Sequence, residues 1–449
     1  MQTIQSLPVA IIGGGPVGLA AAAHLTVRGM PFMLFESGNA VGANVLLWRH
    51  VRVFSPWRYN VDKAARQLLE TSGWQHPDED ALPTGEELYL NYFEPFAALD
   101  AIGPSIRVKS KVLAVGRKNQ DKLKTKGRDT LPYVLQVLHE DNRISQYEAR
   151  AVIDASGTWN SPNPIGSGGI FAVGELENSR QIFYGIPDVL GEHRERYKNK
   201  NILVVGAGHS AINTILELDK LKDEHPGTQI NWVLRKKYVS EVYGGQEADA
   251  LPARGALGIR IEQLVNDDRV NVYTPFQIHQ VVKQDRQLAV VGHQHDELGM
   301  LGSIDEIISN TGSRPDFSFL REVRLSADPA LESVAEIAEL IDPNIHSCGT
   351  VRPHGERELR QPDKDFYVVG SKSYGRAPTF LMATGYEQVR SVVAALAGDW
   401  EAARNVELDL PETGVCSVSS GGESDGAACC GPAPAAKTEE KVVASACCG

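Results

Sequence analysis

Short apolar runs alternate with longer segments of helical periodicity along most of this chain. Residues 8–12 (PVAII) and 32–35 (FMLF) are apolar runs of the kind found in buried parallel strands. An alanine-rich segment over residues 19–28 lies between them and ends at Gly29, which is typical of a helix followed by a C-terminal glycine. The pattern therefore predicts a strand–helix–strand unit near the N-terminus.

The same pattern recurs about 190 residues further along the chain. A strand is predicted over residues 201–205, followed by a helix that ends at about residue 221. A second strand over residues 230–234 leads into the basic run 235–237. Two such units predict an α/β fold with two Rossmann-like dinucleotide-binding domains.

Further elements complete this prediction. A capping box at residues 84–87 opens a predicted helix through residue 99, and another helix is expected over residues 384–396. Strands are expected over residues 106–115, 132–138, 146–153, 306–312 and 366–370. The last two strands end on glycine, and we expect both to return the chain to the first domain's sheet. Glycine, serine, alanine and proline dominate residues 411–449, so this tail is predicted to be disordered.

Charge and composition restrict the class of partner. The chain has 449 residues, of which 45 are basic and 57 acidic, giving a formal net charge of −12. This acidity argues against nucleic acid or an anionic membrane as a partner, and no apolar run approaches the ~18 residues of a membrane span. The first eight residues lack the features of a signal peptide. We therefore expect a cytoplasmic protein that acts on a small molecule, and its oligomeric state stays open.

The first glycine-rich loop follows the first predicted strand directly. In GGGPVG, Gly13 allows a tight turn, Gly15 lets the backbone approach a pyrophosphate, and Gly18 lets the helix pack on the strand. Pro16, in the same loop, is counted with them as cofactor-binding. Glu36, after the second strand, is placed to accept hydrogen bonds from an adenosine ribose. A plain glycine-rich turn is the alternative, but strand, loop, helix, strand and acid in this order favour a dinucleotide site.

The second loop, GAGHSA, differs from the first in its third position and in the residues after its second strand. Its predicted cofactor-binding residues are Gly206, Gly208, His209, Ser210 and Ala211. Arg235 stands where an acid would mark NAD, and together with Lys236 it would attract the 2′-phosphate of NADP. The alternative is that the basic run 235–237 is only the solvent-exposed end of a strand and binds no phosphate. His209 is expected to border the phosphates or end the helix, without a catalytic role.

Two dinucleotide sites in one chain imply a resident cofactor, since at most one of them serves a mobile nicotinamide. FAD at the N-terminal site is the natural choice, because hydride then passes from nicotinamide to flavin. We therefore expect FAD and NADPH as cofactors. The FAD-binding domain is predicted over residues 1–160 and 313–410, and the NADPH-binding domain over residues 161–312.

With these features the chain resembles the flavoproteins that have two dinucleotide-binding domains. They include thioredoxin reductase-like enzymes and the flavin-containing, Baeyer–Villiger and N-hydroxylating monooxygenases. The resemblance covers about residues 8–400 and includes the short domain crossings, matched by DASG ending at Gly157 and NTG ending at Gly312. Residues 36–44 are similar to the Glu…Gly-Gly segment of the monooxygenases. The aromatic residues after it would approach the flavin ring or belong to the core: Trp48, Phe54 and Trp57.

The same resemblance leaves reductase and oxygenase open. Disulfide reductases of this superfamily need a Cys-x-x-Cys pair beside the flavin, which the chain lacks, and Cys348 is expected to be an inert buried thiol. Gly370 is followed by Ser371, where the reductases usually carry aspartate, and this resembles the monooxygenases. The monooxygenase fingerprint Phe-x-Gly-x-x-x-His begins at Phe183 but has Val189 in place of histidine.

Five of the six cysteines lie in the predicted tail. They are Cys416, Cys429, Cys430, Cys447 and Cys448. Soft thiolates select soft, thiophilic ions, whereas zinc sites usually have Cys-x₂₋₄-Cys spacing. The paired tail cysteines are similar to the C-terminal pair of mercuric reductase, and the whole chain resembles the flavin-dependent monooxygenases of arsenic-resistance operons. That resemblance implies oxidation of trivalent (methyl)arsenicals, and we expect the tail to capture this substrate. A neutral low-complexity extension is the alternative.

The expected function is an NADPH-dependent FAD oxidoreductase, and in particular a monooxygenase of a soft nucleophile such as trivalent arsenic. One alternative is a flavin reductase that passes electrons to an external disulfide, quinone or partner protein. Another is a non-catalytic flavoprotein that binds metalloid. No catalytic residue and no metal site are assigned.

Overall fold

The computed structural model describes residues 4–249, 251–295, 297–345 and 351–408 of the chain. Within them the strands form two sheets of five strands and two sheets of three. The α-helices of these residues are α1 Pro16–Val27, α2 Ala43–Leu46, α3 Lys63–Glu70, α4 Gly85–Leu88, α5 Glu94–Ala97, α6 Arg194–Tyr197, α7 His209–Glu224, α8 Pro252–Asn266, α9 Ala338–Ile341, α10 Glu356–Leu359, α11 Met382–Leu396 and α12 Trp400–Arg404. None of the helices in the described residues is long and apolar enough to cross a membrane.

The first five-stranded sheet has the order β16-β7-β1-β2-β3, and the strand pairs along it are parallel. Its strands are β1 Val9–Ile12, β2 Phe32–Phe35, β3 Ile106–Arg107, β7 Ala151–Asp154 and β16 Phe366–Val368. All four residues of β1 are buried, as expected for an apolar run that pairs on both sides, with β2 and with β7. The strand predicted from residues 366–370 therefore does return to the first sheet.

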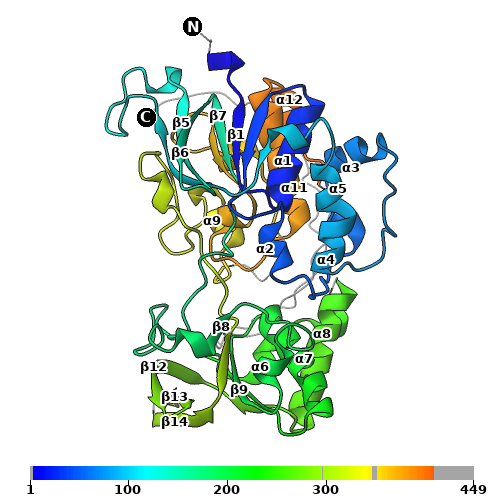
Figure 1. Ribbon diagram of the computed structural model, residues 1–449, viewed down its shortest axis with the longest axis vertical. Helices are drawn as coiled ribbons and strands as arrows, with labels where there is room; N and C mark the ends of the chain where they lie inside the picture. Colours follow the sequence, from blue (N-terminus) through cyan, green and yellow to red (C-terminus); the bar gives the residue numbers. More distant parts are fainter. Residues whose placement is uncertain (1–3, 250, 296, 346–350, 409–449) are drawn as a thin grey trace, which may run out of the picture. The chain divides into compact units, whose positions relative to one another are not determined.

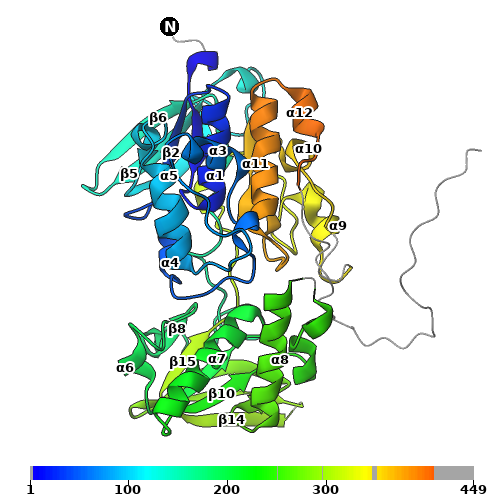
Figure 2. The ribbon, with the colours of Figure 1, turned by 90° about the vertical axis from the view of Figure 1, so that its right-hand side faces the viewer.

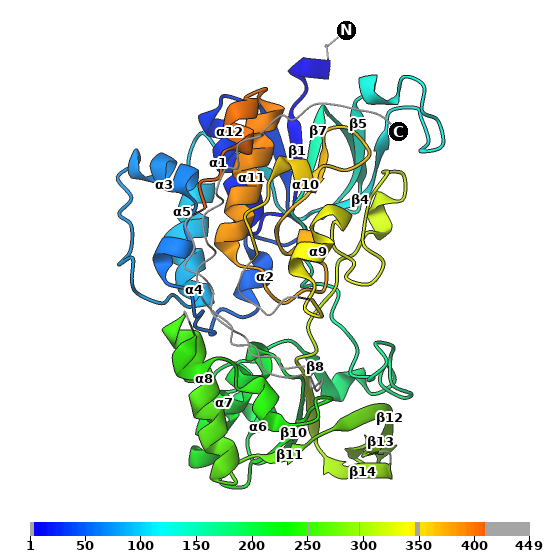
Figure 3. The same ribbon diagram turned by 180° about the vertical axis from the view of Figure 1, so that it is seen from behind.

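Helices from the two ends of the described chain lie side by side on this sheet. α1 and α11 are adjacent in Figure 1 and again from behind in Figure 3. Residues 20–23 of α1 are alanines without exposed surface. Their small side chains let α1 fit closely between the sheet and α11. The Arg28 guanidinium donates to the Asp399 carboxylate at 3.0 Å, which joins the end of α1 to the start of α12.

The second five-stranded sheet has the order β11-β10-β9-β15-β8 and is also parallel. Its strands are β8 Ile182–Tyr184, β9 Asn201–Val205, β10 Gln229–Val233, β11 Asn271–Tyr273 and β15 Glu306–Ser309. α7 and α8 run next to each other along it (Figure 2). The expectation that residues 306–312 return to the first sheet is wrong, because β15 pairs with β9 and β8, with Glu306 opposite Ile202. An apolar run that ends on glycine does not specify which of two similar sheets it joins.

Two antiparallel three-stranded sheets accompany the parallel ones. They are formed by β4 Ser110–Arg117, β5 Tyr133–His139 and β6 Ile144–Ala149, and by β12 Phe276–Gln284, β13 Gln287–Gln294 and β14 Glu297–Ile304. The predicted strands over residues 106–115 and 146–153 are each divided in two, because their outer parts, β3 and β7, pair in the first parallel sheet. Lys109, with φ of 51°, separates β3 from β4, and Arg150, whose N–H donates to the Pro8 carbonyl, separates β6 from β7. The sheet β12-β13-β14 was not anticipated.

The predicted helix over residues 84–99 is present but interrupted. The capping box is confirmed, because the Thr84 hydroxyl accepts from the Glu87 N–H and the Glu87 carboxylate accepts from the Thr84 N–H. A π-helical stretch, Tyr89–Phe93, separates α4 from α5. Pro95, in the first turn of α5, has no N–H to give to the preceding turn, and this accounts for the local change of hydrogen-bond pattern.

Candidate functional site

The loop between β1 and α1 presents an open helix N-terminus. Gly15 is the N-cap of α1 without a side-chain hydrogen bond, and Pro16 begins the helix. A Cβ atom built on Gly15 meets no atom within 4 Å. The first N–H groups of a helix have no partner inside it, and together with the helix dipole they attract an anionic group. The space in front of Gly15 can therefore receive a phosphate.

Two other glycines of this loop are required by the packing of the protein itself. Gly13 has φ of +99°, and a Cβ on it would lie 2.6 Å from the Ala155 carbonyl oxygen. A Cβ on Gly18 would lie 1.9 Å from the carbonyl oxygen of Gly13. Gly13 and Gly18 thus shape the loop, whereas Gly15 leaves free space in front of it.

Glu36 follows β2, and its carboxylate is held against the first loop. Oε2 accepts a hydrogen bond from the Gly14 N–H at 2.7 Å, and Oε1 accepts one from the Gly38 N–H at 2.6 Å. The residue is 9% exposed. These two charge-assisted hydrogen bonds fix the carboxylate. Its remaining lone pairs can accept ribose hydroxyl groups, the role predicted from the sequence.

The crossings that contain Gly157 and Gly312 are bonded to each other. The Asn163 N–H donates to the Gly312 carbonyl at 2.9 Å, and the Ser313 hydroxyl donates to the Thr158 hydroxyl at 2.9 Å. The crossings follow β7 and β15, so each leaves its sheet at the carboxyl end of a strand. In open parallel sheets this is the end at which ligands bind.

A buried ion pair lies beside Gly370. The Lys372 ammonium donates to the Asp154 carboxylate at 2.7 Å and to the Ser156 hydroxyl at 3.0 Å, and neither charged residue has exposed surface. The ammonium also lies 4.5 Å from the ring centre of Phe319, a cation–π contact. The pair connects the end of β7 to the turn that begins at Gly370.

A second buried network holds the turn at Gly370. The Gly370 N–H donates to Gln388 Oε1 at 2.7 Å, and Gln388 Nε2 donates to the Ser373 hydroxyl and to His354 Nε2, both at 2.9 Å. Burial lowers the pKa of His354. The neutral imidazole can therefore accept the hydrogen bond from Gln388, and α11 fixes the position of Gly370.

The loop between β9 and α7 repeats the arrangement of the first. Gly206 has φ of +142°, and a Cβ on it would lie 2.3 Å from the Asn310 carbonyl oxygen. Gly208 is the N-cap of α7, and a Cβ on it meets nothing within 4 Å. Ala211 is fully buried at the third position of the loop. Again one glycine shapes the loop and another leaves the helix N-terminus open.

His209 and Ser210 begin α7 and face different surroundings. The His209 ring lies 5.4 Å from the ring of Phe54. Burial lowers the pKa of His209, and the nearby positive charge of Arg254 lowers it further. The imidazole is therefore held neutral beside the Phe54 ring. The expectation that His209 has no catalytic role stays a prediction. Ser210 lies in the lining of a cavity in front of the loop.

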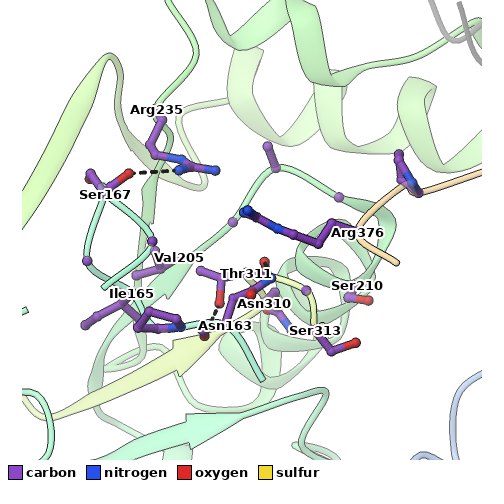
Figure 4. Close-up of a pocket in the computed structure, with 18 of the residues that line it drawn as sticks. Asn163, Ile165, Ser167, Val205, Ser210, Arg235, Asn310, Thr311, Ser313 and Arg376 are labelled. Atoms are coloured by element: carbon purple, nitrogen blue, oxygen red, sulfur yellow. Dashed lines mark hydrogen bonds between the residues drawn. The ribbon is translucent and has the colours of Figure 1, made fainter. Parts of the chain in front are cut away.

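This cavity has a volume of about 790 Å³ and opens in front of the second loop (Figure 4). Residues 206–208, 310–313 and 375–378 contribute to its lining. Its charged members are Arg235, Lys236 and Arg376, and no carboxylate occurs among the described residues that line it. In a chain with a net charge of −12, a cavity with cations alone marks a binding site for an anion.

Arg235 lies at the edge of the cavity and is exposed. Its Nη1 atom donates a hydrogen bond to the Ser167 carbonyl oxygen at 3.0 Å, as Figure 4 shows. The Lys236 ammonium is 3.8 Å from the Glu241 carboxylate, so its charge is partly compensated. The guanidinium of Arg235 keeps further N–H donors for a phosphate.

The three aromatic residues predicted for the flavin wall have different environments. Trp57 is 3% exposed and belongs to the core of the first sheet's region. Trp48 is partly buried, with its ring 6.4 Å from that of Trp159. Phe54 packs against His209. Of the two roles expected for these residues, Trp57 therefore has the role in the hydrophobic core.

All six cysteines lie outside the described residues. The predictions for Cys348 and for the five tail cysteines, and the predicted disorder of the tail, concern these positions and stay predictions. In the described ranges, no group of three or more His, Cys, Asp or Glu residues could hold a metal ion.

Sequence reasoning missed Asp154, Lys372 and Arg376. Lys372 had a usable signal, because a lysine in the stretch FYVVGSKSYG stands next to an apolar strand that must be buried. Arg376 had none, because only folding brings it to the second loop.

Comparisons with known proteins find a matching family, related sequences and similar solved structures. The sequence model of a family described as pyridine nucleotide-disulphide oxidoreductase matches residues 10–349. The chain is 25% identical over 219 residues to the probable indole-3-pyruvate monooxygenase YUCCA3 of Arabidopsis thaliana, covering 46% of this chain and 43% of that protein. It is 23% identical over 328 residues to a ferredoxin–NADP reductase of Lacticaseibacillus paracasei, covering 71% and 77%. The match thus spans less than half the length of the plant relative.

Two solved structures share the fold. The bacillithiol disulfide reductase of Bacillus cereus superposes with a TM-score of 0.64 at 17% identity, covering 87% of this chain and 99% of that one. The FAD-bound cadaverine monooxygenase of desferrioxamine biosynthesis from Erwinia amylovora gives 0.63 at 14% identity, covering 91% and 97%. The predicted α/β fold with two Rossmann-like domains is confirmed.

Proposed function

The chain belongs to the pyridine nucleotide-disulphide oxidoreductase family, and from this membership we propose that it is an NADPH-dependent FAD oxidoreductase. Its cofactors are FAD and NADPH. The observation that carries the proposal is the cavity in front of the second open loop, which contains three cations and no carboxylate among its described lining residues. The first loop, beside the Glu36 carboxylate, has the same open geometry and provides the site for a resident dinucleotide.

The two loops differ in the charge beside them, and this assigns the cofactors. The first loop is next to the Glu36 carboxylate, which suits ribose hydroxyls and would repel a 2′-phosphate. The second is followed by Arg235, which suits a 2′-phosphate. We therefore place FAD at the first loop and NADPH at the second.

Arg235→Glu is expected to weaken NADPH binding about a hundredfold, because repulsion replaces a charge-assisted hydrogen bond. Binding of NADH should be unchanged or tighter. Stopped-flow flavin reduction at varied nucleotide concentrations measures both affinities. Lys237→Glu is the matched control, because Lys237 is a neighbouring basic residue outside the cavity lining. An unchanged preference in the Arg235 variant would assign the 2′-phosphate to another site.

The residues of the chain bind and position the cofactors. The open N-termini of α1 and α7 bind the pyrophosphate groups, and the buried Lys372–Asp154 pair and the Gln388 network fix the turn at Gly370. Bound FAD, once reduced by NADPH, supplies electron transfer and the activation of O₂. No acid–base pair of the protein is needed for oxygen transfer to a soft nucleophile.

Within this class we propose a monooxygenase that oxidises a soft nucleophile, with trivalent arsenic as the leading substrate. Two features support it: the chain matches indole-3-pyruvate monooxygenases over 46% of its length, and five cysteines close to its C-terminus offer soft ligands. The second candidate is a flavin reductase with an external acceptor. It is supported by the ferredoxin–NADP reductase, which matches 71% of the chain.

Adding arsenite to the full chain with NADPH and air separates these functions. Oxygenation predicts arsenate with matching oxygen and NADPH consumption, a reductase needs another acceptor, and a metalloid-binding flavoprotein consumes no NADPH in response to arsenite. Deleting residues 412–449 should raise the apparent KM for arsenite and leave kcat at saturation largely unchanged, because capture raises local substrate concentration only. NADPH consumption without arsenate would contradict the oxygenase.

A further inference from the structure

Arg376 enters the cavity from a different part of the chain than the second loop. It lies between β16 and α11, which both belong to the first sheet's region, yet it lines the same cavity as Gly206, Gly208 and Arg235. Figure 4 shows the side chains of Arg376 and Arg235 extending toward each other across this cavity. The two cations therefore converge on one space.

The backbone of Arg376 is firmly placed. Its N–H donates to the Leu331 carbonyl at 2.8 Å. The preceding Gly375 packs so closely that a Cβ on it would lie 2.1 Å from the same carbonyl oxygen. The backbone contacts with Leu331 therefore fix Arg376 at the cavity, and its position there does not depend on the conformation of its long side chain alone.

The guanidinium of Arg376 has no protein partner among the described residues. Glu332, the acid of the nearby 331–333 segment, pairs instead with Arg314 at 3.4 Å. Two guanidinium groups that point at each other without a carboxylate repel one another. Such an arrangement is stabilised when an anion lies between them.

We propose that Arg376 and Arg235 together bind the 2′-phosphate of NADPH, which makes Arg376 a specificity-determining residue. The inference rests on the proposed NADPH site. A phosphate monoester carries a charge of about −1.5 to −2 at neutral pH, so one arginine compensates only about half of it. The second arginine completes the compensation, and because it comes from the first sheet's region, bound NADPH connects that region to the second loop.

Calorimetric titration of the flavin-loaded full chain with NADP⁺ and with NAD⁺ tests this without turnover. Arg376→Ala is expected to weaken NADP⁺ binding about tenfold, the loss of one charge-assisted contact at an exposed site, and to leave NAD⁺ binding unchanged. Arg376→Lys should lose less NADP⁺ affinity than Arg376→Ala, because lysine keeps the positive charge although it lacks the planar guanidinium. Arg321→Ala, an exposed arginine outside the cavity, is the matched control and should bind both nucleotides as the parent does.

The proposal is overturned if Arg376→Ala binds NADP⁺ as tightly as the parent, or if NADP⁺ and NAD⁺ weaken equally. Arg235→Ala separates this failure from failure of the proposed function. Weakened NADP⁺ binding in the Arg235 variant alone would retain the NADPH site and remove Arg376 from it. A parent protein that binds neither nucleotide would reject the NADPH site as a whole.

Discussion

Gly15→Val is expected to give a folded but colourless protein. Gly15 has φ of −76° and ψ of −175°, an extended conformation open to any residue, and a Cβ there meets no protein atom within 4 Å. The added side chain therefore costs the fold little but occupies the space of the flavin pyrophosphate. We expect FAD affinity to fall by more than about a hundredfold, or about 3 kcal/mol, measured as flavin absorbance per protein after purification.

Two further variants separate binding from folding. Gly208→Val makes the same change at the second loop, where a Cβ also meets nothing, so it should keep the flavin and lose reduction by NADPH. Gly13→Val should reduce stability even without cofactor, because its Cβ would contact the Ala155 carbonyl at 2.6 Å. Full flavin content in Gly15→Val would show that the cofactor binds elsewhere.

Lys372→Met is expected to lower the free energy of unfolding by about 3–5 kcal/mol, the usual cost of leaving one buried charge without its partner. Asp154 has no exposed surface, and its carboxylate would lose the ammonium at 2.7 Å. Denaturant unfolding of the flavin-loaded protein, followed by circular dichroism, measures the change. The exposed Lys364 lies just before β16, and Lys364→Met should leave stability nearly unchanged.

The double variant Lys372→Met, Asp154→Asn tests the cause of this loss. Removing both charges avoids an uncompensated buried ion, so most of the lost stability should return. If the double variant is as unstable as Lys372→Met, the lysine stabilises the fold through its packing and its cation–π contact with Phe319 instead.

Much of the fold follows from local patterns in the sequence. The runs 8–12 and 201–205 become β1 and β9 within one residue at their ends, because a run buried on both faces must be apolar throughout. The capping box at Thr84 is present as predicted. The π-helical stretch after it escaped prediction, since it depends on how Pro95 interrupts a continuous helical pattern.

Non-local pairing was harder to infer. β15 joins the second sheet although its sequence would suit the first equally well, and the antiparallel sheet β12-β13-β14 was not expected at all. Strand order depends on contacts between residues far apart in the chain. A short apolar run specifies burial but not its neighbours.

The sequence by itself determined the two strand–loop–helix units and the opposite charges of Glu36 and Arg235, because both depend on short spacings that hold within one βαβ unit. Only the tertiary structure decided which glycines face open space, that Lys372 and Asp154 meet as a buried pair, and that Arg376 enters the cavity beside Arg235. Arg235 and Arg376 are far apart along the chain. Their convergence depends on contacts between distant segments, such as the hydrogen bond from the Arg376 N–H to the Leu331 carbonyl, and no local pattern of residues encodes these contacts.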